Sequence, residues 1–400
     1  MVNSGRRFKL AILASHPVQY YTSLFKALAS RPEIDLAVYF CMDWGAREYL
    51  DPEFGIKVKW DTQPLAGYPY TLLKNFSPVP ATDRSFFGLI NPGIIPELLR
   101  RRFDAVIIPG YALLSYWLGY CGAWLSGTPV LFRGDSVLRP DQPPWIRWPK
   151  KTALSMLFRG TAAFLTLGSP SRGFYSSFGI PDEKMFFSPL TVDNDFFAQE
   201  CSRHKIEREK LKSDLRLNGI PVILFVGKLV DRKRPQDLLT AYRTVEKEAG
   251  LVFVGEGPLR PELEREVRNS GFSRVVFVGF KNQTELPAYY AMADLFVLPS
   301  DAGGEVSPLA IQEAMCSGLP LLISEAIPSS VDMVHPGVNG YLFPPRDTAR
   351  LGQLLHLLVA DESGRKTAGV RSQEIIGRWS VPQAVEGIVA AMATIRPCGK

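Results

Sequence analysis

Cysteine and histidine are scarce in this sequence, and neither residue type is clustered. The 400 residues include five cysteines and four histidines, and their dispersed positions do not have the spacing of a metal site. An odd number of scattered cysteines also differs from the paired framework of a small secreted protein. We therefore expect a cytoplasmic protein with reduced thiols and no zinc site.

The sequence also lacks a strong excess of charge of either sign. Its formal net charge is +6, which is too dilute along the chain for a dedicated nucleic-acid binder. A mildly basic protein of this kind fits two roles, the handling of phosphates and contact with an anionic membrane. The hydrophobic share of 46% permits a large core.

Charged residues are absent between Asp104 and Arg133, and this run is long enough to span a bilayer. Pro109-Gly110 and residues 127–129 interrupt it. Because buried parallel strands are apolar throughout, we favour a buried strand-helix-strand unit over a transmembrane helix. The predicted pieces are a strand at 105–108, a helix at about 113–125 and a strand at 130–132.

Short apolar runs alternate with helical patterns in two series along the chain. This alternation predicts α/β architecture with parallel sheets. The charge-dense residues 201–210 separate the series and indicate a domain junction or an exposed helix beside one. We therefore expect two doubly wound domains with a cleft between them. The runs are 10–14, 36–40, 105–108, 130–132 and 163–167, then 222–226, 251–254, 275–278, 295–298 and 320–323.

Residues 304–318 form the most informative stretch, because they connect an apolar run to a helical pattern. Ser307 and Pro308 are typical of a helix start, with the hydroxyl as the cap and the proline at the first helical position. Glu305 and Glu313 lie eight positions apart on either side of that start. A helix N-terminus can bind phosphate, and a carboxylate can bind sugar hydroxyls. The stretch therefore favours an anionic, hydroxyl-rich ligand such as a nucleotide-sugar.

A basic turn follows the predicted strand at 222–226. After Gly227, four cations occur within seven residues: Lys228, Arg232, Lys233 and Arg234. A buried diphosphate needs compensating positive charge, and lysine is a common partner for phosphate. The alternative is a solvated basic turn, but the nearby pair Glu305 and Glu313 favours the phosphate site.

With these motifs, the chain resembles the family-4 glycosyltransferases, which have the GT-B fold of two facing Rossmann-like domains. The match covers nearly all of residues 220–350 and is weaker in the first half, at 15–20 and 192–197. The carrying residues are Gly227-Lys228-Leu229 with Lys233, then 252–258, 277–280 and 289–300, then Glu305 with 313–315 and 318–320, and finally 337–343.

This resemblance implies roles for individual residues. Lys228 and Lys233 would hold the donor diphosphate and stabilise the leaving group, and Glu305 would contact the transferred sugar. Glu313 would hold the donor ribose. Such enzymes retain anomeric configuration and use these cations in place of a metal, so the resemblance implies no metal ion and no cofactor. Main-chain groups near Phe280 and Asn282 would face the nucleotide base. The other expected donor contacts are Gly227, Gly257, Ser307, Pro308 and Leu309.

The chain departs from the family pattern at the acceptor end. The usual glycine-rich first loop is replaced by residues 16–19, and Arg133-Gly134-Asp135 follows the strand at 130–132. Asp135 and His16 are therefore both candidates for the catalytic base, although His16 also fits a loop residue that bonds nearby backbone. The metal-like sequence Asp193-Asn194-Asp195 fits turn and cap residues better than a metal site.

The resemblance also predicts the domain organisation and the partners. Residues 1–195 would bind the acceptor, residues 196–379 would bind the nucleotide-sugar, and the last helix, within 380–400, would return to the first domain. Basic and aromatic residues at 139–159 suit peripheral contact with an anionic membrane such as the inner face of the cytoplasmic membrane. The alternative for this segment is a solvated loop followed by an amphipathic core helix.

We therefore predict a retaining glycosyltransferase that transfers a sugar from a nucleoside-diphosphate-sugar to a glycan or lipid-linked acceptor, in cell-surface polysaccharide or glycolipid biosynthesis. No nucleic-acid partner is expected. One alternative is a sugar-nucleotide-binding protein without activity, which the altered Arg133-Gly134-Asp135 sequence keeps open. The other is a nucleotide-sugar epimerase of the same fold, which Glu305 supports poorly because no convincing histidine accompanies it.

Overall fold

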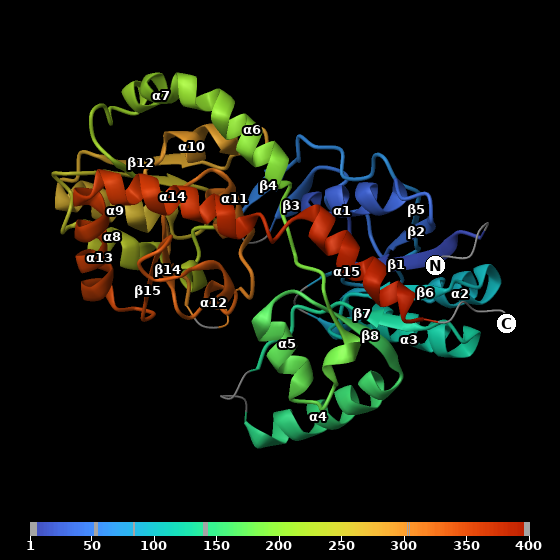
Figure 1. The fold of residues 1–400 in the computed structure, drawn as a ribbon. Helices are drawn as coiled ribbons and strands as arrows, with labels where there is room; N and C mark the ends of the chain where they lie inside the picture. Colours follow the sequence, from blue (N-terminus) through green and yellow to red (C-terminus); the bar gives the residue numbers. More distant parts are fainter. Residues whose placement is uncertain are drawn as a thin grey trace. The chain divides into compact units, whose positions relative to one another are not determined.

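The computed structural model describes residues 6–51, 55–82, 85–138, 143–301, 303 and 305–395 (Figure 1). The chain divides into two compact units. The first unit comprises Met1–Arg47, Gln63–Leu190 and Val381–Lys400, and the second comprises Glu48–Thr62 and Thr191–Ser380. The segment Glu48–Thr62, which the predicted boundaries put in the first domain, thus groups with the second unit.

The first unit contains a seven-stranded sheet in which every neighbouring pair is parallel. Its order is β5-β2-β1-β6-β7-β8-β9. The central strands read as continuous apolar runs because both faces of a parallel sheet are covered. The strands are β1 (Phe8–Ala14), β2 (Ile34–Phe40), β5 (Tyr70–Leu72), β6 (Ala105–Ile108), β7 (Val130–Phe132), β8 (Thr161–Thr166) and β9 (Met185–Phe187).

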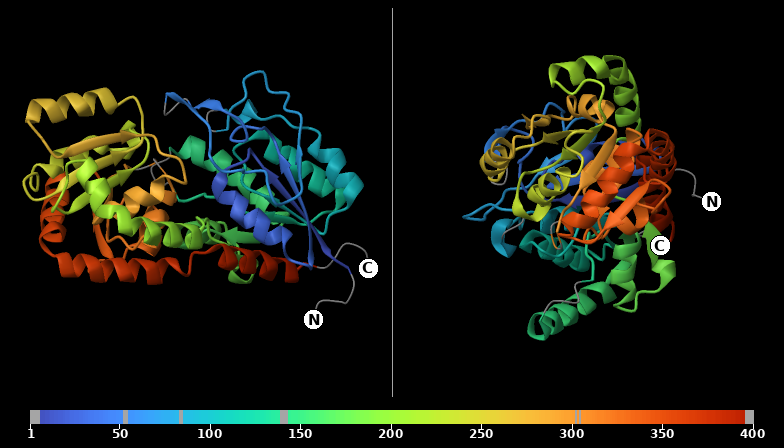
Figure 2. Two further views of the ribbon diagram at one scale, coloured as in Figure 1. Left: turned by 90° about the horizontal axis from the view of Figure 1, so that it is seen from above. Right: turned by 90° about the vertical axis from the view of Figure 1, so that its left-hand side faces the viewer.

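Helices cover both faces of this sheet (Figures 1 and 2). Alternate residues of β1 belong to two different cores: Leu13 packs with the residues of α2 to α5, and Ile12 packs with those of α1 and α15. This follows from the two-residue period of a strand. The helices are α1 (Gln19–Ala29), α2 (Ile94–Arg101), α3 (Leu114–Ser126), α4 (Pro144–Arg159), α5 (Ser169–Ser176) and α15 (Val381–Ala393), with short 3-10 turns at Phe86–Gly88 and Asp182–Lys184.

The uncharged run between Asp104 and Arg133 forms β6, α3 and β7, which confirms the prediction of a buried strand-helix-strand unit. In the part of the chain that the structure describes, no helix has the length and apolar character needed to cross a bilayer. The last helix, α15, packs closely on β9. A Cβ atom on Gly387 would lie 1.9 Å from the carbonyl oxygen of Phe187, so this approach requires glycine.

The second unit has a six-stranded sheet, again with parallel neighbours throughout. Its order, β12-β11-β10-β13-β14-β15, is that of a Rossmann fold. The strands are β10 (Val222–Val226), β11 (Gly250–Val254), β12 (Val275–Gly279), β13 (Leu295–Leu298), β14 (Leu321–Ser324) and β15 (Gly340–Phe343). These two parallel sheets confirm the predicted α/β class.

The helices of the second unit are short to medium in length. They are α6 (Asn194–His204), α7 (Arg208–Asp214), α8 (Pro235–Tyr242), α9 (Arg260–Ser270), α10 (Leu286–Met292), α11 (Leu309–Cys316), α12 (Ser330–Met333), α13 (Thr348–Ala360) and α14 (Glu362–Ile376), with 3-10 turns at Lys205–Glu207 and Asp231–Lys233. An antiparallel hairpin of β3 (Tyr49–Asp51) and β4 (Ile56–Val58) completes this unit.

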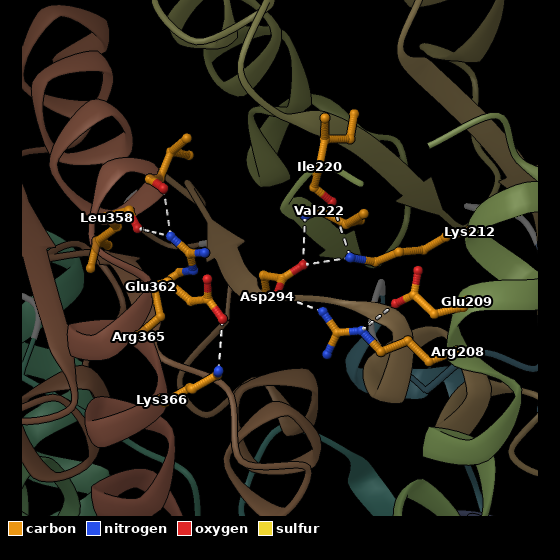
Figure 3. A network of polar contacts seen from close by, with 11 residues as sticks. Arg208, Glu209, Lys212, Ile220, Val222, Asp294, Leu358, Glu362, Arg365 and Lys366 are labelled. Atoms are coloured by element: carbon orange, nitrogen blue, oxygen red, sulfur yellow. Dashed lines mark hydrogen bonds and ion pairs between the residues drawn. The ribbon is translucent and has the colours of Figure 1, made fainter. Parts of the chain in front are cut away.

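The charge-dense segment at 201–210 spans the end of α6, the 3-10 turn at Lys205–Glu207 and the start of α7, and buried charge holds α7 in place (Figure 3). The carboxylate of Asp294, just before β13, accepts from Arg208 at 2.6 Å and from Lys212 at 3.0 Å. It also accepts from the backbone N–H of Val222 at 2.9 Å. At the start of α6, Asp193 accepts from the N–H of Phe196, which confirms the predicted capping role.

Candidate functional site

The switch point of the second sheet lies between the adjacent strands β10 and β13. After β10 the chain continues to β11 on one side of this point, and after β13 it continues to β14 on the other side. Ligands of doubly wound sheets bind at the carboxyl ends of the strands at this point. The loop after β10 carries Gly227, Lys228 and Lys233, and the loop after β13 carries Glu305. The fold therefore brings four of the predicted site residues to one edge. Gly304, from the same predicted stretch, lies outside the described residues.

Lys233 and Glu305 form an ion pair, although 72 positions separate them in the chain. The other oxygen of Glu305 accepts from Nη1 of Arg232 at 3.1 Å, so the carboxylate binds two cations. Lys233 is only 4% exposed. Burial lowers its pKa, and the charge of Glu305 opposes that shift. Arg232 was not predicted as a site residue, although the run of four cations contained the signal.

Lys228 is held by a carboxylate from the β3–β4 hairpin. Its Nζ donates to the two carboxylate oxygens of Asp51 at 3.2 and 3.1 Å. Asp51 is 8% exposed. The sequence offered no sign of this pair, because the residues are 177 positions apart and the hairpin carries no motif.

Gly255 and Gly257 are required by a close approach of two loops. A Cβ atom on Gly257 would lie 2.4 Å from the carbonyl oxygen of Leu229, and one on Gly255 would lie 2.0 Å from that of Gly227. The N–H of Leu229 also donates to the carbonyl of Glu256 at 2.8 Å. The sequence suggested a tight turn here. The structure adds that the loop after β11 lies directly on the loop after β10 and shapes it.

The start of α11 lies one residue later than predicted. The helix begins at Leu309, and Pro308 is the cap residue, because its ψ of 122° is extended rather than helical. The prediction that Ser307 caps the helix and that Pro308 is its first residue was therefore wrong by one position, which is a common error at helix ends. Ser307, Pro308 and Leu309 still lie at the N-terminal end of α11.

Glu313 lies on α11 and points into a buried environment. It is 6% exposed, and one of its oxygens accepts a hydrogen bond from the hydroxyl of Tyr290 at 2.6 Å. Burial raises the pKa of Glu313 to about 7, and the hydrogen bond from Tyr290 partly opposes that rise. Tyr290, on α10, was missed by the sequence reasoning.

Phe280 and Asn282 follow β12 and meet the segment that continues from β4. The ring of Phe280 lies 5.7 Å from that of Trp60, centroid to centroid. The side-chain amide of Asn282 donates to the carbonyl of Lys59 at 3.1 Å. The two residues predicted to face a nucleotide base are therefore next to the hairpin that also holds Lys228.

The two candidates for the catalytic base lie in the first unit, in loops at the carboxyl ends of β1 and β7. His16 is partly buried, and its Nδ1 lies 2.9 Å from the hydroxyl of Ser15. Burial lowers the pKa of His16 to about 4, so the imidazole is neutral at pH 7. Asp135 is exposed. Its charge adds to the effect of burial in raising the pKa of Tyr20.

Side chains from α1 and α5 fix the loop that carries Asp135. The guanidinium of Arg133 lies 5.5 Å from the ring centroid of Tyr21 and donates to the carbonyl of Pro189 at 2.9 Å. The hydroxyl of Tyr175 donates to the carbonyl of Gly134 at 2.9 Å. These contacts give the unusual Arg133-Gly134-Asp135 sequence a structural role in addition to any catalytic one.

Solved structures of similar fold support this architecture. Anabaena Alr3699/HepE in complex with UDP has a TM-score of 0.73, is 16% identical, and covers 97% of this chain and 100% of its own. The same protein in complex with UDP-glucose has a TM-score of 0.71, with 16% identity and the same coverage. At this identity the likeness concerns the fold, and it confirms the predicted GT-B fold.

Sequence comparisons extend the likeness to a family. The family model described as "Glycosyl transferases group 1" matches residues 207–374. GDP-mannose-dependent alpha-(1-6)-phosphatidylinositol monomannoside mannosyltransferase of Mycobacterium tuberculosis is 28% identical over 305 residues, 72% of this chain and 77% of the relative. The 2-deoxystreptamine glucosyltransferase of Streptomyces kanamyceticus is 30% identical over 287 residues, 66% of this chain and 70% of the relative. With the family model on the second unit and such relatives matched over both units, the chain belongs to the glycosyl transferase group 1 family and is a glycosyltransferase.

Proposed function

We propose that this glycosyltransferase uses a nucleoside-diphosphate-sugar as donor and a glycan or lipid-linked molecule as acceptor, in the synthesis of a cell-surface polysaccharide or glycolipid. It would retain the anomeric configuration and work without a metal ion. The observation that carries the proposal is the cluster of Lys228, Arg232 and Lys233 beside Glu305 at the switch point of the second sheet. Three cations at this position suit a diphosphate.

The names of the relatives support this class of donor. The mycobacterial relative is named as GDP-mannose-dependent, and Alr3699/HepE was solved with UDP-glucose. The two names carry different bases and sugars, so the shared feature is the nucleoside diphosphate. In this chain, Glu313 would bind the ribose hydroxyls, and the backbone at Ser307–Leu309 would bind the distal phosphate.

In the proposed reaction, the bond between the anomeric carbon and the diphosphate oxygen breaks, and the acceptor oxygen bonds to the same face of that carbon. Lys228 and Lys233 stabilise the negative charge that develops on the leaving diphosphate. Glu305 contacts the hydroxyls of the transferred sugar. Either His16 or Asp135 would accept the proton of the acceptor hydroxyl, and His16 is already in its neutral form at pH 7 because its pKa is about 4.

Peripheral contact with an anionic membrane is part of the proposal, and α4 is the candidate element. Its inner face carries Leu154, Leu157 and Phe158, which are buried, so the predicted amphipathic core helix is present. The opposite face is exposed and combines apolar and basic residues, as interfacial helices do. This face includes Trp148, Lys151, Thr152, Met156 and Arg159, with Trp145 exposed one turn before it. Arg139 lies outside the described residues, as does the side chain of Arg147.

A donor panel tests the enzymatic proposal. We expect one of UDP-glucose, UDP-galactose, UDP-N-acetylglucosamine or GDP-mannose to raise the melting temperature, since a donor at 100 times its dissociation constant adds about 2.7 kcal/mol. The same donor should be hydrolysed slowly, and addition of EDTA should leave the rate unchanged. Proton NMR of the first-formed sugar should show the donor's anomeric configuration. Binding without turnover would instead favour a sugar-nucleotide-binding protein, and loss of activity with EDTA would contradict metal independence.

Vesicle flotation tests the membrane contact. The protein should bind vesicles that contain phosphatidylglycerol more strongly than vesicles of phosphatidylcholine alone, and the double substitution W148A/K151A should weaken that binding. A matched control is V370A on α14, which removes an exposed apolar side chain of the second unit. Equal binding of the double variant and the wild type would exclude α4 as the contact.

A further inference from the structure

Within the second unit, the described parts of the segment Glu48–Thr62, residues 48–51 and 55–62, contact the residues expected to bind the donor. Asp51 pairs with Lys228, and Trp60 contacts Phe280. Three further bonds fix the segment: Asn282 to the carbonyl of Lys59, the backbone N–H of Thr284 to Asp61, and the hydroxyl of Thr284 to the same carboxylate. This segment therefore lies along the site from its diphosphate end to its base end.

The pair between Asp51 and Lys228 occupies the position where a donor diphosphate is expected. Nζ of Lys228 lies at nearly equal distances from both oxygens of Asp51, at 3.1 and 3.2 Å. Asp51 is almost fully buried, so water solvates its carboxylate poorly. A buried carboxylate needs a nearby cation to stabilise its charge. Asp51 thus supplies negative charge at the position where the phosphate is expected.

A count of charge indicates what happens when a diphosphate arrives. In the ion pairs among the described residues at this edge, Lys228, Arg232 and Lys233 contribute three positive charges, and Asp51 and Glu305 contribute two negative ones. A diphosphate of about two negative charges would bring an excess of negative charge into a partly buried site, which is costly. If Asp51 leaves Lys228, the three cations balance Glu305 and the diphosphate.

Of the two carboxylates, Asp51 is the one placed to leave. Glu305 binds two cations at once, one of them the buried Lys233. Asp51 lies at the end of a strand of three residues in a two-stranded hairpin, which is a weak unit of structure. The hairpin can shift while the contacts of Lys59, Trp60 and Asp61 keep the segment on the second unit.

We propose that Asp51 is the resting counter-ion of Lys228 and that the donor diphosphate takes its place. This inference rests on the proposed function, because it requires Lys228 to bind the diphosphate. Since the segment stays attached beyond β4, Asp51 remains at a high effective concentration near Lys228. It therefore weakens donor binding and, after transfer, helps to expel the nucleoside diphosphate.

The test uses D51N in the full-length protein, with UDP, GDP and inorganic pyrophosphate as probes in isothermal titration calorimetry. We expect the probe that binds the wild type to bind D51N about tenfold more tightly, which corresponds to about 1.4 kcal/mol. In steady-state kinetics, KM for the donor and kcat should both fall, because release of the nucleoside diphosphate slows. If D51N does not fold, D51S replaces it.

Two controls make the result specific. E48Q removes a negative charge from the same segment but from an exposed residue that faces Lys57, and it should change affinity less than about twofold. In a K228A background, D51N should bring no gain in affinity, because the cation for which Asp51 and the diphosphate compete is gone. An equal gain from E48Q, or a gain that persists without Lys228, would overturn the inference.

The outcomes also separate this inference from the proposed function. Unchanged or weaker binding by D51N, with the wild type binding UDP, GDP or pyrophosphate normally, would overturn the role of Asp51 alone. If neither the wild type nor D51N binds any of the three probes, the proposed donor site itself is wrong.

Discussion

The hydroxyl of Tyr290 donates a hydrogen bond to the carboxylate of Glu313, with 2.6 Å between the two oxygens. The residues come from α10 and α11, and both are buried. Burial raises the pKa of Glu313 to about 7, while the bond from Tyr290 favours the charged form. Near neutral pH, this carboxyl group is therefore poised between its two protonation states. Both the stability of the fold and the proposed binding of the donor ribose depend on which state is present.

Replacement of Glu313 by glutamine should stabilise the protein at alkaline pH. The pKa of Glu313 rises from an ordinary value of 4.5 to about 7 on folding, so the stability that the neutral form contributes is full below pH 4.5 and is lost as pH rises to about 7. We expect E313Q to exceed the wild type by about 1–3 kcal/mol at pH 8 and to match it more closely at pH 5. Urea unfolding at the two pH values measures this. A difference that does not depend on pH would contradict the burial of a titrating carboxyl group.

Removal of the Tyr290 hydroxyl should shift the pH dependence of donor binding. Without the hydroxyl of Tyr290, the pKa of Glu313 should rise further, because the hydrogen bond that favours the carboxylate is lost. If the carboxylate binds the ribose, donor affinity in the wild type should strengthen as pH rises through about 7, and in Y290F the midpoint should lie at higher pH. Donor affinity is measured for both proteins between pH 6 and 9. Because the same donor is used, changes in its own protonation affect both proteins equally and cancel in the comparison. An unchanged midpoint would count against the ribose assignment.

The strands that the sequence predicted share one physical property. The ten apolar runs correspond to strands within about two residues because buried parallel strands are apolar throughout. The five missed strands, β3, β4, β5, β9 and β15, have only three or four residues each, which is too short to show a period. β5, β9 and β15 are also edge strands of their sheets, where the demand for apolar residues is weaker.

The sequence pointed to individual candidate residues of the site, but it could not predict which of them contact one another. Lys233 and Glu305 each stood out by their position after a strand, yet their ion pair spans 72 positions and depends on how the strands are ordered in the sheet. Asp51 carries no motif, and Tyr290 lies in the family-like stretch 289–300 without an assigned role, because both roles depend on the partners that the fold provides. The start of α11 was misplaced because Ser-Pro fits both a cap followed by the first helical residue and, as here, a cap at the proline.

Loss of Lys233 should impair catalysis more than folding. K233A removes a cation that we propose lies against the leaving diphosphate, and we expect it to cost at least about 2–3 kcal/mol of transition-state stabilisation. The readout is kcat/KM for the donor identified by the panel. K366A on α14, an exposed lysine paired with Glu362 at 2.7 Å, is the matched control and should keep the wild-type rate. A near-wild-type rate for K233A would exclude the role in leaving-group stabilisation.

A methyl group on Gly257 should disturb the loop that carries Lys228. The added Cβ would lie 2.4 Å from the carbonyl oxygen of Leu229, and backbone atoms cannot move aside as a flexible side chain can. We expect G257A to lose about 1–3 kcal/mol of stability and to bind the donor more weakly. G173A in α5 is the control, because its Cβ would meet no atom within 4 Å and alanine favours the helix. Wild-type affinity and stability in G257A would show that the two loops are not tightly packed.

Replacement of Asp294 by asparagine should destabilise the second unit. Burial alone disfavours this carboxylate, but Arg208 and Lys212 outweigh it and hold the pKa of Asp294 below its ordinary value. The charged form of Asp294 therefore contributes to stability above about pH 4, and this contribution is lost as pH falls through the lowered pKa. In D294N, Lys212, which is 5% exposed, stays buried without its charged partner, so we expect a loss of about 3–5 kcal/mol at pH 7.

Chemical unfolding at pH 7 measures this loss, and E362Q on α14 serves as the control. Glu362 pairs with the exposed Lys366 in the neighbouring network (Figure 3), so its removal should leave the unfolding midpoint unchanged. The difference between D294N and the wild type should shrink when the measurement is repeated at acidic pH, because the wild-type carboxylate is then protonated as well. A D294N protein as stable as the wild type at pH 7 would mean that α7 is held by its apolar contacts and not by this buried charge.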